Sequence, residues 1–434
     1  MFFKPFFPVL LICGLLFGGP AMAQGEDESL LEGIGIELHG FLDARYGRRI
    51  QSDPHAQNTS LGEARLQLDA SHMGDWLSWQ VRSDFLYDEV PGHHNLNLED
   101  GSGPIDLREA NLLFSPADFM DVKLGRQILT WGTGDLIFIN DLFPKDWQAF
   151  FIGRDEEYLK APSDALFVSL FPAFANIDLV YTPRFDADRF ISGDRLSYFN
   201  PMLDRRAGRD AVIDTDKPND WFDDDELSVR ISKNLGSYEL ALYGYDGFWK
   251  SPVGMDPATG KALFPKLAVY GASLRGGLGK GLFTVEAGYY DSKEDRDGND
   301  PLLPNSEWRL LLGYERELGR DFSGGIQYYL EYMEEHEDFL ASLPAGQKGR
   351  DEDRHVITLR LTKLAFNLNL TLSLFTFYSP SDEDLYARSI IKYKLTDAWL
   401  LTVGGNLFTG RKDNTFFGQF EKNSNLYAGV RYSF

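Results

Sequence analysis

The sequence has very little cysteine, no long apolar run after its first 23 residues, and fewer basic than acidic residues. Cys13 is the only cysteine among 434 residues, so the chain cannot form an internal disulfide or a cysteine-based metal site. The 66 acidic residues outnumber the 43 basic ones and give a net charge of −23 at pH 7, which argues against nucleic acid as a partner. A membrane-spanning helix needs about 20 apolar residues in succession. Insertion into a membrane would therefore have to use β-strands.

The first residues have the composition of a secretory signal. Lys4 provides a basic start, residues 6–17 are mostly apolar, and residues 21–23 form an Ala-Met-Ala cleavage site. We therefore predict a signal peptide at residues 1–23 that is cleaved before Gln24.

A lipoprotein signal at Cys13 is the alternative interpretation of the same segment. Bulky Ile12 stands where that signal has a small residue, which disfavours this alternative. Residues 24–34 are interpreted as a periplasmic N-terminal segment that precedes the folded domain.

Segments in which apolar and polar residues alternate recur along the rest of the chain. Between residues 35 and 46, Ile36 and Leu42 share one face of an extended strand, whereas Glu37 and Asp43 share the other. The same pattern recurs at residues 63–70, 79–87, 226–231, 238–245, 283–290, 308–315, 322–332, 357–361, 368–376, 385–393 and 399–408. This period, over about ten residues, is typical of membrane-spanning strands with one face toward lipid and the other toward a lumen.

The connections between these segments also alternate, between short turns and mostly long loops. Short turns are expected near residues 72–77 and 116–120, whereas residues 88–104 and 184–225 are examples of long loops. Counting the connections predicts about 18 strands, with 16 as the alternative. We therefore predict an all-β fold for residues 35–434: a membrane-spanning, antiparallel, up-and-down β-barrel with short periplasmic turns and long extracellular loops.

The last residues, 425–434, alternate in the same way and end on an aromatic side chain. Gly429, Tyr432 and Phe434 resemble the C-terminal signal of bacterial outer-membrane β-barrels. That resemblance implies the barrel-assembly machinery as a partner during biogenesis and places the chain in the outer membrane, next to lipid and lipopolysaccharide.

Many of the residues that face inward on the predicted strands are charged. A barrel of 16–18 strands encloses a lumen wide enough for an aqueous channel. The candidate pore-lining residues are Arg45, Arg65, Arg82, Arg230, Arg309, Arg360, Arg388, Arg431, Glu37, Asp43, Glu63, Asp69, Asp84, Glu286 and Glu331. They could form neutralising cross-strand pairs, or opposed arcs whose field orients passing polar solutes. Both interpretations can hold in different layers of the wall.

One segment breaks the alternation. Residues 132–158 are rich in glycine and large apolar residues, among them Ile137, Phe143, Trp147 and Phe151, which a water-exposed loop would not normally carry. We predict that this loop folds into the barrel and narrows the pore. Packing among external loops, or a misread hairpin, are the alternatives.

This region carries a second resemblance. Gly125-Arg126-Gln127, Trp131-Gly132, Asp135, Asn140-Asp141, Pro144 and Asp146 resemble the signature of porin-like outer-membrane families and, more distantly, of alginate-export barrels. The resemblance implies that Arg126, Gln127, Trp131, Asp135, Asp141 and Trp147 belong to the constriction. Strand parity instead places Arg126 on the lipid face with Leu124, unless a bulge at Gly125 turns it inward. The mixed luminal charge disfavours alginate as the substrate.

Catalytic and metal sites are not expected. The histidines form no group with a nucleophile, and the pair His93-His94 lies in an acidic loop where solvated side chains are the rule. The acidic stretches 223–225 and 291–300 lack the spacing of a calcium loop and fit a solvated external face. No cofactor is expected.

The sequence thus predicts a porin-like channel that passes small polar or amphipathic solutes across the outer membrane. A plugged barrel that serves as partner of an envelope export or lipid-transfer system is the alternative function. A homotrimer stays open as the oligomeric state, because trimers are common among porins.

Overall fold

The computed structural model describes residues 35–91, 95–347 and 349–434. The predicted signal peptide (residues 1–23), the segment 24–34 and the pair His93-His94 lie outside these residues. Within the described part of the chain, no helix is long and apolar enough to cross a membrane.

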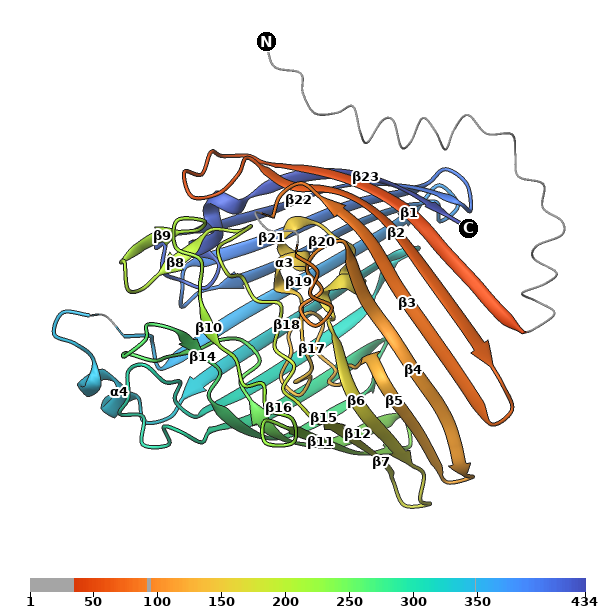
Figure 1. Ribbon diagram of the computed structural model, residues 1–434, viewed down its shortest axis with the longest axis horizontal. Helices are drawn as coiled ribbons and strands as arrows, with labels where there is room; N and C mark the ends of the chain where they lie inside the picture. The colour runs from red at the N-terminus through yellow and green to blue at the C-terminus, as the bar shows by residue number, and fades with distance from the viewer. Residues whose placement is uncertain (1–34, 92–94, 348) are drawn as a thin grey trace, which may run out of the picture.

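The described chain folds into a closed, antiparallel sheet of 18 strands (Figure 1). The strands are β1 (Ile36–Arg49), β2 (Thr59–Met73), β3 (Leu77–Asp88), β4 (Ile105–Ala117), β5 (Met120–Ile128), β6 (Pro162–Leu170), β7 (Asn176–Thr182), β11 (Glu226–Leu235), β12 (Tyr238–Phe248), β15 (Lys266–Leu278), β16 (Gly281–Ser292), β17 (Glu307–Gly319), β18 (Phe322–Met333), β19 (Asp353–Ala365), β20 (Leu370–Ser379), β21 (Asp384–Lys394), β22 (Trp399–Gly410) and β23 (Asn425–Ser433). Each strand pairs with the next one along this series, which confirms the predicted all-β, up-and-down barrel and its count of 18 strands.

The first and last strands close the barrel. β1 pairs with β23 from Phe41, opposite Ser433, to Arg49, opposite Asn425. Gly40 and Phe434 extend this pairing by exchanging two backbone hydrogen bonds of 3.0 Å. Closure satisfies the backbone groups that an open edge would leave exposed to hydrocarbon.

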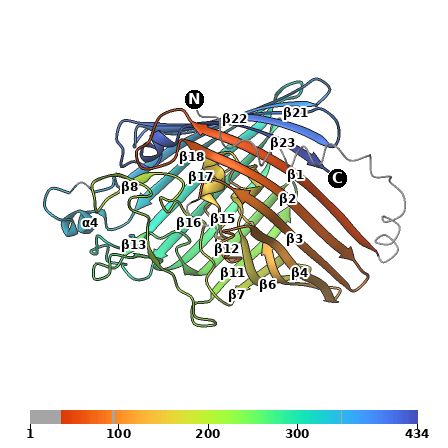
Figure 2. The same ribbon diagram turned by 45° about the horizontal axis from the view of Figure 1, so that its top comes forward.

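The two ends of the barrel differ, as the sequence predicts. Short turns join the strands at one end, whereas the loops at the other end contain further elements (Figures 1 and 2). These elements are α3 (Trp147–Ile152), η1 (Glu156–Leu159), β8 (Tyr198–Asn200), β9 (Arg205–Ala207), β10 (Thr215–Asp216), β13 (Gly254–Met255), β14 (Ala262–Leu263), α4 (His336–Ser342) and η2 (Gly418–Asn423). By the usual orientation of such barrels, the short turns are periplasmic and the long loops extracellular.

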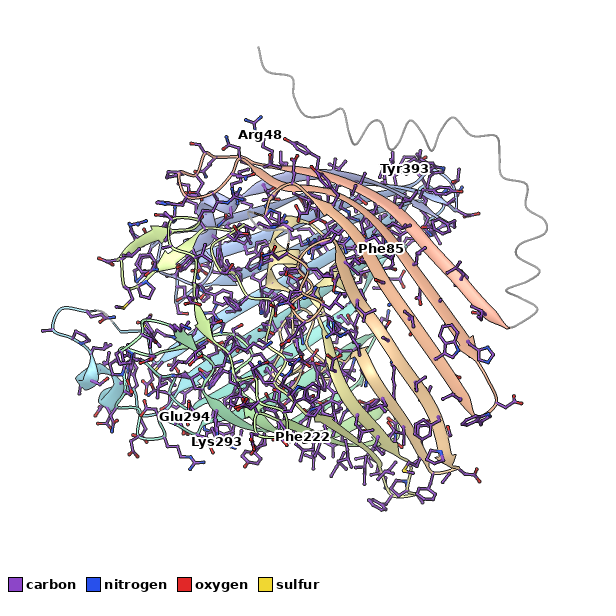
Figure 3. All side chains as sticks on the ribbon, in the orientation of Figure 1. Arg48, Phe85, Phe222, Lys293, Glu294 and Tyr393 are labelled. Carbon is purple, nitrogen blue, oxygen red and sulfur yellow. The ribbon has the colours of Figure 1, made fainter. Side chains whose placement is uncertain are left out.

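The outward face of the wall is apolar. Leu312 on β17, Ile326 on β18 and Val403 on β22 are 42%, 53% and 54% exposed, although none of them would gain from contact with water. Phe85 and Tyr393, labelled in Figure 3, are exposed in the same way. A continuous apolar surface of this kind on a closed sheet is a lipid-facing belt, so the protein is a membrane-spanning barrel of the outer-membrane type.

This belt generates a prediction that depends on depth. Leu312 lies near the middle of β17, and Leu318 faces the same way near the periplasmic end of that strand. We expect Leu312→Arg to lower the free energy of unfolding in lipid vesicles by about 2–4 kcal/mol, and Leu318→Arg by about 1 kcal/mol or less. Guanidinium titration of the refolded protein measures both. Equal losses would show that β17 is not centred in the hydrocarbon layer.

Candidate functional site

The connection between β5 and β6, residues 129–161, lies inside the barrel, and we call it the inner loop. In both ribbon views its helix α3 lies within the ring of strands (Figures 1 and 2). Ile139, Phe150, Phe151 and Ile152 of the inner loop are at most 3% exposed. They pack in one hydrophobic cluster with inward-facing residues of the wall, so the barrel wall and the inner loop cover each other's apolar side chains.

Local sequence explains the short helix in this loop. The Asp146 carboxylate caps α3 by accepting a hydrogen bond of 2.7 Å from the Ala149 amide. Gly153 ends the helix in the left-handed conformation, with a φ of 99°. A Cβ atom at Gly153 would lie 2.4 Å from the ring of Tyr427 on β23, so only glycine permits this close approach.

A buried carboxylate on β16 holds the first half of the inner loop. Glu286 is 1% exposed and accepts hydrogen bonds of 2.8–3.1 Å from Thr133, Gly134 and Asn140. Charge-assisted bonds to backbone amides are among the stronger hydrogen bonds in proteins. Glu286 therefore fixes the path of residues 133–140 against the wall.

An ion pair extends this attachment to β18 and β19. The Arg360 guanidinium binds both oxygens of Asp135, at 2.5 and 2.7 Å. The Gln327 side chain brackets the Asp135 backbone, accepting from its amide at 2.7 Å and donating to its carbonyl at 2.8 Å. Asp135 thus holds the inner loop to two neighbouring strands.

The second half of the inner loop is attached to the strands that close the barrel. Asp155 accepts from Arg45 on β1 and Arg431 on β23, each at 2.5 Å, and from Lys392 on β21 at 2.9 Å. Its neighbour Arg154 binds Glu63 on β2 at 2.5 Å. Residues 154–155 therefore join the loop to the seam between the first and last strands.

Tyr158 continues this attachment to β2 and β3. Its hydroxyl donates to Asp84 at 2.8 Å, and the Arg65 guanidinium lies 4.2 Å from the centre of its ring. The inner loop therefore contacts β16–β19 on one side of the lumen and β1–β3 with β21–β23 on the other.

A second loop, residues 183–225, covers the inner loop from the extracellular side. Asp188 accepts from the Lys145 amide at 2.7 Å and from the Trp147 indole at 2.9 Å. Arg189 binds Asp106 on β4 through two bonds of 2.8 and 2.9 Å. The sequence indicated residues 184–225 only as a long loop, so this contact is a structural finding.

Aromatic rings fill the lumen beside β20–β23. Phe150 and Phe151 of α3 pack against Tyr386 at 5.6 and 5.2 Å between ring centres. Tyr386 stacks on Phe408 at 4.5 Å, and η2 adds Phe420 to the same group. All of these rings are buried, so this side of the lumen is closed by packing.

On the opposite side of the lumen a cavity of about 470 Å³ remains between the inner loop and β15–β19. The inner loop contributes Trp131, Asp135, Phe138, Glu156 and Lys160 to its lining, and the wall contributes Arg275, Glu315, Gln327 and Arg360. Positive, negative and aromatic groups thus face one space. Several wall residues lie near the short-turn ends of their strands, so the cavity occupies the periplasmic half of the lumen.

The predicted pore-lining residues all have the inward parity of their strands. The following residues each contact a neighbouring strand of the wall or the inner loop: Arg45, Arg65, Arg82, Arg230, Arg309, Arg360, Arg388, Arg431, Asp43, Glu63, Asp69, Asp84, Glu286 and Glu331. Glu37 is exposed at the short-turn end of β1. Most of the arginines lie in close pairs with carboxylates, which is the arrangement expected of a neutralised wall.

The residues of the Gly-Arg-Gln segment do not join the cavity. Arg126 pairs with Asp164 of β6 at 2.7 and 2.8 Å and has the same parity as outward-facing Leu124. The pairing of β4 with β5 runs through Gly125 without a shift in register. Strand parity, rather than the family resemblance, therefore gives the position of Arg126. Gln127 points inward but is fully buried against the wall and donates to the Ala165 carbonyl at 2.9 Å.

The other predicted loop residues have different roles. Trp131 and Asp135 line the cavity, and so does Asp141, whose carboxylate binds Lys145 at 3.0 Å. Trp147 is held by Asp188 and packs against aromatic neighbours. Sequence reasoning missed Asp155, because the run Asp155-Glu156-Glu157 has the appearance of a solvated acidic stretch.

Comparison with solved structures supports the fold. OccAB3 of Acinetobacter baumannii aligns with a TM-score of 0.53 and 10% identity, covering 92% of this chain and 99% of that one. OccK11 (OpdR) of Pseudomonas aeruginosa aligns with a TM-score of 0.51 and 9% identity over 92% and 95% of the two chains. OccK5 (OpdH) of the same organism gives a TM-score of 0.51 and 9% identity over 92% and 98%. The chain thus has the fold of bacterial outer-membrane porins.

No protein-family model matches the chain, and no curated protein matches it in sequence. The family signature around Gly125 and the resemblance to alginate-export barrels therefore stay predictions.

The attachment of Asp155 can be tested by substitution. Asp155→Asn leaves Arg45, Arg431 and Lys392 close together with less negative charge, so we expect the free energy of unfolding in lipid vesicles to fall by about 3 kcal/mol. The exposed pair Arg205–Asp210 is the control, and Asp210→Asn should cost less than about 1 kcal/mol. Similar losses in the two variants would contradict the anchoring role.

Asp186, in the loop of residues 183–225, makes stability depend on pH. Burial and the neighbouring Glu226 carboxylate raise the pKa of Asp186 to about 7, although Lys250 lies nearby. Between its ordinary pKa and 7, the folded state holds a proton that the unfolded chain releases. The stabilisation from this proton is therefore complete at low pH and is lost as the pH rises toward 7.

Asp186→Asn removes this titration. We expect the stability of the wild type relative to the variant to decrease between about pH 4 and pH 7 and to stay level above that range. Parallel denaturant titrations of both proteins measure the difference. A difference that does not change with pH would show that Asp186 titrates normally.

Proposed function

We propose that this protein is a porin-like channel of the outer membrane for small polar or amphipathic solutes, and that the inner loop narrows its lumen. The observation that carries the proposal is the inner loop itself, which is attached to both sides of the wall yet leaves a cavity of about 470 Å³. A barrel built only as a scaffold would have no need of a charged cavity beside such a loop.

The lining of the cavity supports the solute class. Arg275 and Glu315 are paired at 3.4 Å but stay 46% and 59% exposed, so each can bind a solute group. Trp131 and Phe138 add apolar surface to the same space. Groups of both charges beside aromatic rings favour a compact solute with polar and apolar parts over a polyanion.

The attachments of the inner loop to the wall determine the width of the path through the lumen. Glu286 and Asp135 hold residues 133–140 against β16–β19, the part of the wall that borders the cavity. Loosening this contact should therefore widen the path. The lipid belt and the last strand, with Gly429, Tyr432 and Phe434, are the surfaces through which we expect lipopolysaccharide and the assembly machinery to act on the protein.

Single-channel conductance in a planar bilayer tests the proposal. Glu286→Gln replaces one acceptor oxygen by an NH₂ group that faces the amides of the loop, and each lost bond to the charged group is worth about 1.5–3 kcal/mol. We expect larger or more frequent openings than in the wild type. A variant without residues 133–150 should conduct more still.

Glu383→Gln is the control, because Glu383 pairs with exposed Arg411 at the long-loop end of the barrel and has no contact with the inner loop among the described interactions. It should leave the conductance close to that of the wild type. A wild type that does not conduct, beside a deletion variant that does, would mean a plugged barrel that needs a partner. Failure of every variant to conduct would rule out the channel.

A further inference from the structure

A groove of about 410 Å³ crosses the lipid-facing side of β18–β23. Its lining includes Leu361, Leu372, Leu374, Ile391, Val403 and Leu426, with Lys363 at one end. The luminal cavity lies on the other face of the sheet and includes only a few of the same strands. This groove is therefore a separate feature of the outer surface.

The strand register explains the shape of the groove. One row of paired, outward-facing residues runs Phe322, Lys363, Leu372, Ile391, Val403 and Ala428. The next row runs Arg316, Gly324, Leu361, Leu374, Ser389, Gly405 and Leu426. Ser389 and Gly405 carry little or no side chain between bulky neighbours, so the surface is hollow at this point.

Basic residues gather at the end of the groove near the short turns. Lys363 lies two residues before the end of β19, and Arg316 lies three residues before the end of β17. The turn between β17 and β18 adds Arg320, which is 96% exposed. Asp321 pairs with Arg320 at 3.5 Å and Glu317 follows Arg316 in β17, so the three basic groups still outnumber the two carboxylates beside them.

The groove also runs from the periplasmic rim into the hydrocarbon core, as the acyl chain of a lipid does. Five strand spacings separate β18 from β23, which gives a length of about 24 Å. Because strands in such barrels tilt by about 40°, the groove rises by roughly 15 Å from the periplasmic rim, about half the thickness of the hydrocarbon core. Tyr393, which lies two residues on the periplasmic side of Ile391, marks the headgroup level (Figure 3).

We propose that this groove binds one anionic glycerophospholipid of the periplasmic leaflet. Its phosphate lies among Lys363, Arg316 and Arg320, and one acyl chain follows the two residue rows past Ser389 toward Leu426. The apolar groove alone would accept any chain, whereas the basic residues at its periplasmic end select a negatively charged headgroup. This inference requires only that the barrel spans the membrane and is independent of what the lumen conducts.

Native mass spectrometry of the refolded protein tests the site. The protein is kept in detergent with equal amounts of palmitoyl-oleoyl phosphatidylglycerol and phosphatidylcholine, and the lipid that stays bound is identified. We expect the wild type to retain phosphatidylglycerol. Ser389→Leu fills the groove and should abolish this retention.

A variant with altered charge tests the contribution of the lipid headgroup separately from that of the acyl chain. Lys363→Gln combined with Arg316→Gln should weaken phosphatidylglycerol binding by roughly tenfold and remove its preference over phosphatidylcholine. Arg316 is exposed and Lys363 is half-buried near the short turns, so this variant tests the site even if Ser389→Leu fails to fold. Ala287→Leu, a lipid-facing substitution on β16 outside the groove, is the matched control and should retain the lipid.

Two results would overturn the proposal. The first is equal retention of phosphatidylglycerol in the wild type, the groove variant and the charge variant. The second is a wild type that is oligomeric and a Ser389→Leu variant that is monomeric, which would make the groove a contact between copies of this chain. Conductance of Ser389→Leu should match that of the wild type, so failure of the lipid site and failure of the channel are distinguishable.

Discussion

The structure depends on one constraint: a backbone amide in hydrocarbon has no water to bond, so every strand needs two neighbours. The pairing of β1 with β23 removes the last free edge and fixes the barrel at 18 strands. The closed barrel also reverses the usual distribution of apolar and charged side chains in a globular protein. Apolar side chains such as Leu312 face outward to lipid, and charged groups such as Glu286 are buried in the interior.

A barrel of this size cannot fill its lumen with wall side chains alone, and the inner loop supplies the missing material. Its Phe150 and Phe151 complete an aromatic core with Tyr386 on the inner wall, where polar side chains are usual. Charged side chains could not fill the lumen in the same way, because each would need its own buried partner. The loop therefore combines apolar packing beside β20–β23 with ion pairs to both sides of the lumen.

The sequence predicted the barrel well because the alternation of outward and inward residues repeats in most strands, and the same alternation predicted the outward position of Arg126. It could not reveal the partners of Asp155, since Arg45 and Arg431 are distant in the chain and meet only when the barrel closes. The sequence could not reveal the contact between residues 183–225 and the inner loop for the same reason, because the two segments meet only when the chain folds. The aromatic inner wall could have been predicted from the sequence, because Tyr386 and its aromatic neighbours have inward parity.

Charge pairing determines what electric field a solute would meet in the lumen. Arg45, Arg65 and Arg431 lie within hydrogen-bond distance of carboxylates, and such pairs have little field beyond their own length. Opposed arcs along the whole wall would therefore add little to the selectivity of the proposed channel. Exposed charges at the cavity, such as Arg275, Glu315 and Glu156, can still act on a solute, because their side chains stay open to the lumen. Any orienting field is thus local to the cavity beside the inner loop, and not a property of the entire barrel.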